Sequence, residues 1–99
     1  TISPFRALPG ARAEAGNMAI MMDSGIRRGT DVLKALAMGA DFVFVGRPFL
    51  YAAAIAGEAG VRHGAKLLRE EISRNMAMLG VSTMAEMTKD FLVPRHGAI

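Results

Sequence analysis

Two short segments that combine glycine with arginine are the best candidates for chemistry in this chain. The first contains Gly25 and Arg27, and the second contains Gly46 and Arg47. Glycine lets backbone N–H groups approach a ligand closely, and an arginine guanidinium donates paired hydrogen bonds to an oxyanion. Because both segments supply this combination, the sequence predicts a site for a phosphate group.

A structural role explains either segment alone equally well. A glycine that follows a strand is commonly a turn residue, and an exposed arginine is usually solvated. The functional interpretation therefore depends on the two segments occupying equivalent places in consecutive units of the fold.

Those places are set by two short apolar runs, one before each segment. Residues 18–22 and 42–45 are apolar at every position, which is typical of strands buried on both faces of a parallel sheet. A helix is predicted over 32–38, with Thr30 or Asp31 as its N-cap. Strand, helix and strand in this order form a βαβ unit, so both segments leave the carboxyl ends of parallel strands. At that edge α/β barrels bind ligands, and after their last two strands they often bind phosphate.

Helices are predicted on both sides of this unit, so the fold class is α/β. Residues 11–15 indicate the end of a short helix or a loop, and 61–79 have the spacing of an amphipathic helix of about six turns. Thr83 and Glu86 have capping-box spacing, which predicts a short helix ending near Lys89. Two strands alone would leave an unpaired edge and an uncovered apolar face, so further strands are expected to complete the sheet.

The composition is that of a packed protein and excludes several classes of function. The 99 residues are 52% hydrophobic and carry a formal charge of +3, which argues against a disordered chain. No nucleic acid partner is expected, because the charge is small and aromatic residues do not alternate with the arginines. There is no cysteine for a disulfide or a thiolate metal site, and the eight methionines are expected to pack in the core. No apolar run approaches the roughly 20 residues that span a bilayer.

One longer stretch resembles a known family. Residues 23–40 read Asp-Ser-Gly-Ile-Arg-Arg-Gly-Thr-Asp-Val-Leu-Lys-Ala-Leu-Ala-Met-Gly-Ala, followed by Gly-Arg-Pro at 46–48 and Gly-Glu-Ala-Gly-Val at 57–61. In this order they resemble the FMN-dependent 2-hydroxy acid dehydrogenases and oxidases, of the lactate dehydrogenase, glycolate oxidase and mandelate dehydrogenase type. The resemblance implies the carboxyl-terminal part of a (β/α)8 TIM barrel, about strands 7 and 8 with their helices. Residues 1–99 would then be a fragment of a single FMN-binding domain.

The resemblance also implies the cofactor, FMN, and the residues that hold it. Six positions match the family's cofactor motif: Asp23, Ser24, Gly25, Arg27, Gly46 and Arg47. The glycines and arginines would bind the phosphate, and Asp23 would bind the ribityl hydroxyls. Ser24 departs from the second glycine of many members, but members that resemble mandelate dehydrogenase have serine there.

The activity implied is oxidation of an L-2-hydroxy acid such as lactate to the 2-oxo acid, with this chain supplying no catalytic residue. The family's catalytic histidine and its carboxylate-binding arginine follow strand six, which would precede Thr1. His63 is predicted on the solvated side of the long helix and His96 lies in the tail, so neither is predicted to act as the base.

The expected partners are the amino-terminal part of the barrel, a small 2-hydroxy acid, and further copies of the enzyme in a tetramer. The expected location is cytoplasmic, with peripheral attachment to the inner membrane as the alternative. Two other functions stay open. The chain could belong to another phosphate-anchoring barrel oxidoreductase, of the inosine-phosphate dehydrogenase or dihydroorotate dehydrogenase type, or it could be a catalytically inert interaction fragment.

Overall fold

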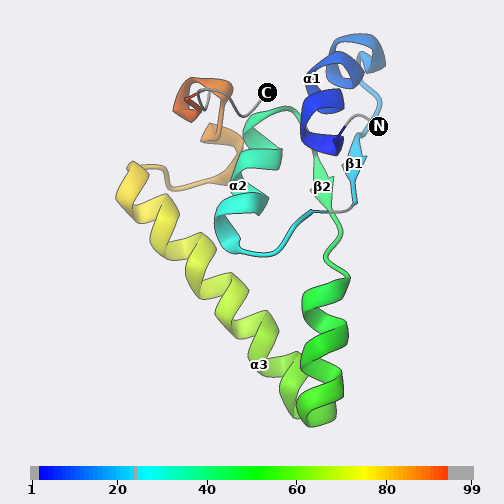
Figure 1. Cartoon of the computed structure of the whole chain (residues 1–99). Helices are drawn as coiled ribbons and strands as arrows, with labels where there is room; N and C mark the ends of the chain where they lie inside the picture. The colour runs from blue at the N-terminus through cyan, green and yellow to red at the C-terminus, as the bar shows by residue number, and fades with distance from the viewer. Residues whose placement is uncertain (1–2, 24, 94–99) are drawn as a thin grey trace.

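The computed structural model describes residues 3–23 and 25–93. In chain order its elements are α1 (Pro4–Ala15), β1 (Met21–Met22), α2 (Gly29–Ala37), β2 (Phe42–Val43), α3 (Arg47–Leu79) and two 3-10 turns, η1 (Met84–Glu86) and η2 (Lys89–Phe91). Figure 1 shows α1 beside the paired strands and α3 extending away from them as two arms joined by a sharp bend. The part of the chain described contains no helix that is long and apolar enough to cross a membrane.

The strands form the βαβ unit that the sequence predicts. β1 and β2 pair in parallel, with Met21 opposite Phe42 and Met22 opposite Val43, and α2 connects them. Both strands are shorter than the predicted runs 18–22 and 42–45. One further ladder bond, from Phe44 N–H to the Met22 carbonyl at 2.9 Å, continues the pairing. Within the described residues each strand has only the other as its neighbour, so both strands have one unpaired edge.

The two faces of this sheet differ in burial. Met22 is only 4% exposed, and with Val43 and Val45 it packs into the core that includes α2. Met21 and Phe42, on the opposite face, are 62% and 64% exposed. Within the described residues only one face of the strands is buried, because helices cover only that face. The expected uncovered apolar face is confirmed.

Helix α2 begins differently from the sequence prediction. Its N-cap is Arg28, not Thr30 or Asp31. Asp31 lies in the first turn, where its Oδ2 accepts hydrogen bonds from the N–H groups of Arg27 and Arg28, each at 3.0 Å. A carboxylate in the first turn satisfies N–H groups that have no partner within the helix, which explains why the helix starts earlier.

Residues 11–15, interpreted from the sequence as the end of a short helix or a loop, are the end of helix α1. The helix begins at Pro4, a favoured first position for proline, and Ser3 Oγ accepts a hydrogen bond from Arg6 N–H at 3.3 Å. Near its end, Arg12 donates to the carbonyls of Gly16 and Met18 at 2.9 and 2.7 Å. These bonds hold the turn between α1 and β1.

Helix α3 also begins earlier than predicted and is bent. The predicted helix over 61–79 is present, but the element starts at Arg47 and is interrupted at Ala56 and Gly57, where the backbone is not helical. Gly57 has φ of 58°, a left-handed conformation that glycine adopts without steric cost. Two arms, 47–55 and 58–79, therefore meet at an angle (Figure 1).

The second arm packs through the middle of its apolar face. Leu68, Ile72 and Met76 are half-buried beside the core around α2, whereas Val61 and Leu79 are exposed. Beyond α3, the predicted capping box is confirmed, with Glu86 Oε1 accepting from the N–H and hydroxyl groups of residues 82 and 83. The helix there is a single 3-10 turn that ends at Glu86, and η2 follows as a separate turn.

Candidate functional site

The two glycine–arginine segments meet at the carboxyl ends of the strands. A cleft of about 330 Å³ lies between them. Its lining residues are Asp23, Gly25, Ile26, Arg27, Phe44, Gly46, Arg47, Pro48 and Leu50. Every predicted cofactor residue is among them except Ser24, which lies outside the described residues.

The backbone at the two glycines is suited to a ligand in different ways. Gly25 has φ of +81°, which L side chains rarely adopt, so the turn after β1 requires glycine. Gly46 has an ordinary negative φ, and a Cβ built on it would meet no atom within 4 Å. The space above Gly46 is therefore open toward the cleft, where a ligand can approach the backbone.

Two arginines supply the positive charge of the cleft. Arg27 and Arg47 are both exposed, and within residues 3–23 and 25–93 neither guanidinium has a hydrogen-bond or ion-pair partner. Arg47 is also the first residue of α3, whose N-terminus contributes partial positive charge. Guanidiniums that are not engaged within the protein are available to an anionic ligand.

Arg28, next to Arg27, is engaged elsewhere. Glu71 Oε2 accepts from Nε and Nη2 of Arg28 at 3.1 and 2.7 Å, and Glu71 Oε1 accepts from Gly29 N–H at 2.9 Å. The hydrogen bond to Arg28 is the main reason that the pKa of Glu71 is lowered, and the same contact raises the pKa of Arg28. Arg28 is thus a charge at the N-cap of α2 that is paired with Glu71.

Sequence reasoning did not find Glu71. The sequence feature that could have identified Glu71 is its position on the long helix. It lies three residues after Leu68 and directly before Ile72, and both of these residues pack on the core. A carboxylate that borders an apolar helix face is close enough to the neighbouring element to meet its N-terminus.

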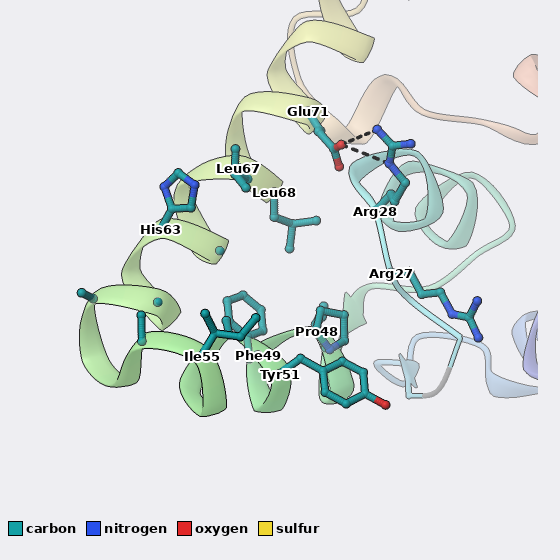
Figure 2. A pocket seen from close by; sticks show the side chains of 16 residues that line it. Arg27, Arg28, Pro48, Phe49, Tyr51, Ile55, His63, Leu67, Leu68 and Glu71 are labelled. Atoms are coloured by element: carbon teal, nitrogen blue, oxygen red, sulfur yellow. Dashed lines mark hydrogen bonds and ion pairs between the residues drawn. The ribbon is translucent and has the colours of Figure 1, made fainter.

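A second and larger hollow, of about 550 Å³, lies between the two arms of α3 and the start of α2. Figure 2 shows its apolar wall, which includes Phe49, Ile55 and Leu67, and the Arg28–Glu71 pair at one end. His63 lies at its rim and is exposed, as expected from the sequence. His96 lies outside the described residues. Those that are described contain no cluster of side chains that could hold a metal ion.

Comparison with known proteins decides which family has this arrangement. A family model described as FMN-dependent dehydrogenase matches residues 1–94. This chain belongs to the FMN-dependent dehydrogenase family. The match favours this family over the inosine-phosphate and dihydroorotate dehydrogenase types, and it confirms FMN as the cofactor of the family to which the chain belongs.

Curated relatives in the FMN-dependent dehydrogenase family act on small 2-hydroxy acids by name. The chain is 47% identical over 98 residues to L-lactate dehydrogenase of Pseudomonas aeruginosa (strain LESB58), covering 98% of this chain and 26% of the relative. It is 46% identical over 82 residues to glycolate oxidase 3 of Oryza sativa subsp. indica, covering 83% and 22%. The chain thus spans about a quarter of the length of the relatives it matches.

Solved structures of family members confirm the fold. A soluble mutant of the membrane-associated (S)-mandelate dehydrogenase from Pseudomonas putida superposes with a TM-score of 0.91 at 39% identity, covering 95% of this chain and 27% of that one. The flavin-binding domain of baker's yeast flavocytochrome b2 gives 0.71 at 43%, covering 79% and 23%. The chain therefore has the α/β fold of one part of a TIM barrel, as the sequence predicts.

Proposed function

We propose that this chain supplies the phosphate end of the FMN site to a barrel that oxidises an L-2-hydroxy acid, such as lactate, to the 2-oxo acid. The single observation that carries the proposal is the cleft in which Gly25 and Arg27 meet Gly46 and Arg47. Family membership and the names of the relatives support the reaction class. When bound, FMN would accept the electrons removed from the substrate.

The donor set of the cleft fits a phosphate monoester. Such a group carries about −1.5 to −2 charge at neutral pH and three acceptor oxygens. The guanidiniums of Arg27 and Arg47 would each donate paired hydrogen bonds, and the open backbone at Gly46 would donate an N–H. Gly25 supplies the turn that places Arg27, and Asp23 would accept from the ribityl hydroxyls. Ser24, between them, would offer its N–H and hydroxyl.

The remaining strands of the barrel are the partner that this fragment requires. Residues 1–99 would form one part of a single domain, with β1 and β2 as strands 7 and 8. The exposed faces of Met21, Phe42 and Phe44 support this role, because they would point into the barrel interior. The catalytic base and the substrate-binding arginine would come from the missing part.

The assembly and the location are proposed from the family resemblance. The family resemblance supports a tetramer of complete barrels in the cytoplasm. Attachment to the inner membrane is supported by one solved relative, described as a monotopic membrane protein. Fractionation of cells that express the complete enzyme would separate the two locations.

The test uses the complete barrel, meaning this chain together with the remaining strands and helices. We expect the purified protein to carry flavin absorbance that bleaches anaerobically on addition of lactate, glycolate or mandelate. Arg27→Ala and Arg47→Ala should each weaken FMN binding about 10- to 100-fold, which corresponds to a charge-assisted hydrogen bond worth about 1.5–3 kcal/mol. Lys34→Ala, an exposed residue on α2 outside the cleft, is the control.

Two results would count against this function. A complete barrel without flavin would favour the inert interaction fragment, whose only support is the uncovered apolar face of the sheet. If bound flavin does not bleach with any 2-hydroxy acid, the proposed cofactor site would stand but the proposed reaction would be wrong.

A further inference from the structure

The two adjacent arginines before α2 have different environments, and Glu71 accounts for the difference. Figure 2 shows the Arg28 guanidinium turned toward Glu71 while Arg27 points away from it. Arg28 does not line the cleft between the two glycine–arginine segments, whereas Arg27 does. Because Arg28 is paired with Glu71, Arg27 is the one of these two arginines that faces the cleft.

The same glutamate restrains the backbone on which Arg27 is placed. Glu71 accepts from Gly29 N–H, and Asp31 accepts from the N–H groups of Arg27 and Arg28. Three consecutive N–H groups at the start of α2 are thus bound by two carboxylates, one inside α2 and one from α3. Because these donors are occupied, they are not offered to a ligand, and their function is to fix the turn.

Close packing makes this restraint rigid. A Cβ built on Gly29 would lie 2.7 Å from Glu71 Cβ and 2.7 Å from Ile72 N, so the first residue of α2 lies directly against the backbone of α3. Helix α3 starts at Arg47, in the second glycine–arginine segment. Arg47 thus begins the first arm of α3, whereas Glu71 lies on the second arm, beyond the break at Ala56 and Gly57.

We propose that Glu71 is a positioning residue for the phosphate site, which fixes the turn that carries Arg27 by tying the second arm of α3 to the start of α2. This proposal rests on the proposed function of the cleft. Glu71 would not touch the cofactor. Its removal would release Arg28, loosen the turn at residues 27–29 and spread the Arg27 guanidinium over more orientations, which weakens binding of a ligand that needs this guanidinium in place.

The test compares two flavins that differ only in the phosphate. The apo form of the complete barrel is titrated with FMN and with riboflavin by flavin fluorescence, and the ratio of the riboflavin Kd to the FMN Kd measures what the phosphate contributes. A general loss of structure weakens both flavins and leaves this ratio unchanged, so the ratio separates positioning from stability. The variants are Glu71→Ala and Glu71→Gln. Glu70→Ala is the matched control, because Glu70 is the exposed neighbour on the same helix.

We expect the ratio to fall about tenfold in E71A and to stay at the wild-type value in E70A. It should fall less in E71Q, whose amide oxygen can still accept from Gly29 N–H. Turnover at saturating FMN should not change, because Glu71 takes no part in the reaction.

The two proposals fail in different ways. A wild-type ratio well above unity that is unchanged in E71A would overturn the role of Glu71 alone. If E71A cannot be prepared in folded form, an unchanged ratio in E71Q would do the same. A wild-type ratio near unity would overturn the phosphate site itself, and the role of Glu71 with it.

Discussion

Arg12 Nη1 donates a 2.8 Å hydrogen bond to Asp41 Oδ2, although the two residues lie in α1 and at the start of β2. The same carboxylate oxygen accepts from Ile20 N–H at 2.9 Å, just before β1. Arg12 also donates to the Gly39 carbonyl at 3.3 Å. The entrances to both strands are therefore joined at one point, at the end of the sheet opposite the phosphate cleft.

Replacement of Arg12 should destabilise the complete barrel. Arg12→Ala removes hydrogen bonds to the carbonyls of Gly16, Met18 and Gly39 as well as the pair with Asp41. We expect a loss of about 2 kcal/mol in the free energy of unfolding, since bonds from a charged donor are worth about 1.5–3 kcal/mol each and exposure reduces that value.

Chemical denaturation of the complete barrel measures this loss, and a second ion pair serves as its control. Arg62 pairs with Glu58 at 2.6 Å, but both side chains are more than three-quarters exposed. Arg62→Ala should change stability by about 0.5 kcal/mol or less. If the two substitutions lowered the free energy of unfolding equally, Arg12 would contribute no more than an exposed ion pair does, which would contradict the prediction.

Asp41 should make stability depend on pH in the acid range. The Ile20 N–H and then the Arg12 guanidinium lower the pKa of Asp41 in the folded state. Its contribution is thus fully present above the unfolded pKa of about 3.9 and disappears as pH falls through the lower folded pKa. Asp41→Asn should lower Tm at pH 7, and the difference from wild type should shrink as the pH falls below about 4. Thermal melts across that range test this, and a constant difference would be the contrary result.

Gly39 is expected to tolerate no side chain. It has φ of +117°, and a Cβ there would lie 2.8 Å from Arg12 Cγ and 2.9 Å from Arg12 Cβ. Gly39→Ala should cost about 1–3 kcal/mol through backbone strain and crowding. Gly10→Ala is the control, because a Cβ at Gly10 meets nothing within 4 Å and alanine favours a helix. Denaturation midpoints should move in opposite directions for the two variants.

Phe42 tests whether other strands cover the open face of the sheet. It is 64% exposed in this chain, and its ring centroid lies 6.3 Å from that of Phe44. If Phe42 were a surface residue, Phe42→Ala would change stability by about 0.5 kcal/mol or less. In the complete barrel we expect a loss of about 3–5 kcal/mol, the cost of emptying a buried aromatic site. Lys66→Ala, at an exposed position on α3, should be neutral in the same denaturation experiment.

Several features were open to prediction because they depend on residues that are near one another in the chain. The apolar runs before Asp23 and Gly46 predicted two strands, and the intervening helical pattern predicted their parallel connection. The capping box of Thr83 and Glu86 was also found, since it depends only on three-residue spacing. The first arm of α3 was missed, because Gly46, Pro48 and Gly57 are read as breaks when their neighbours are unknown.

By itself, the sequence determined that two glycine–arginine segments follow consecutive parallel strands, and so meet at one edge of a sheet. Only the tertiary structure showed why the adjacent Arg27 and Arg28 lie in different environments. Arg27 and Arg28 are adjacent and chemically identical, and they differ because Glu71, more than 40 positions away, lies within reach of one and not the other. Local pattern sets which groups a loop carries, but long-range packing sets which of them remain available to a ligand.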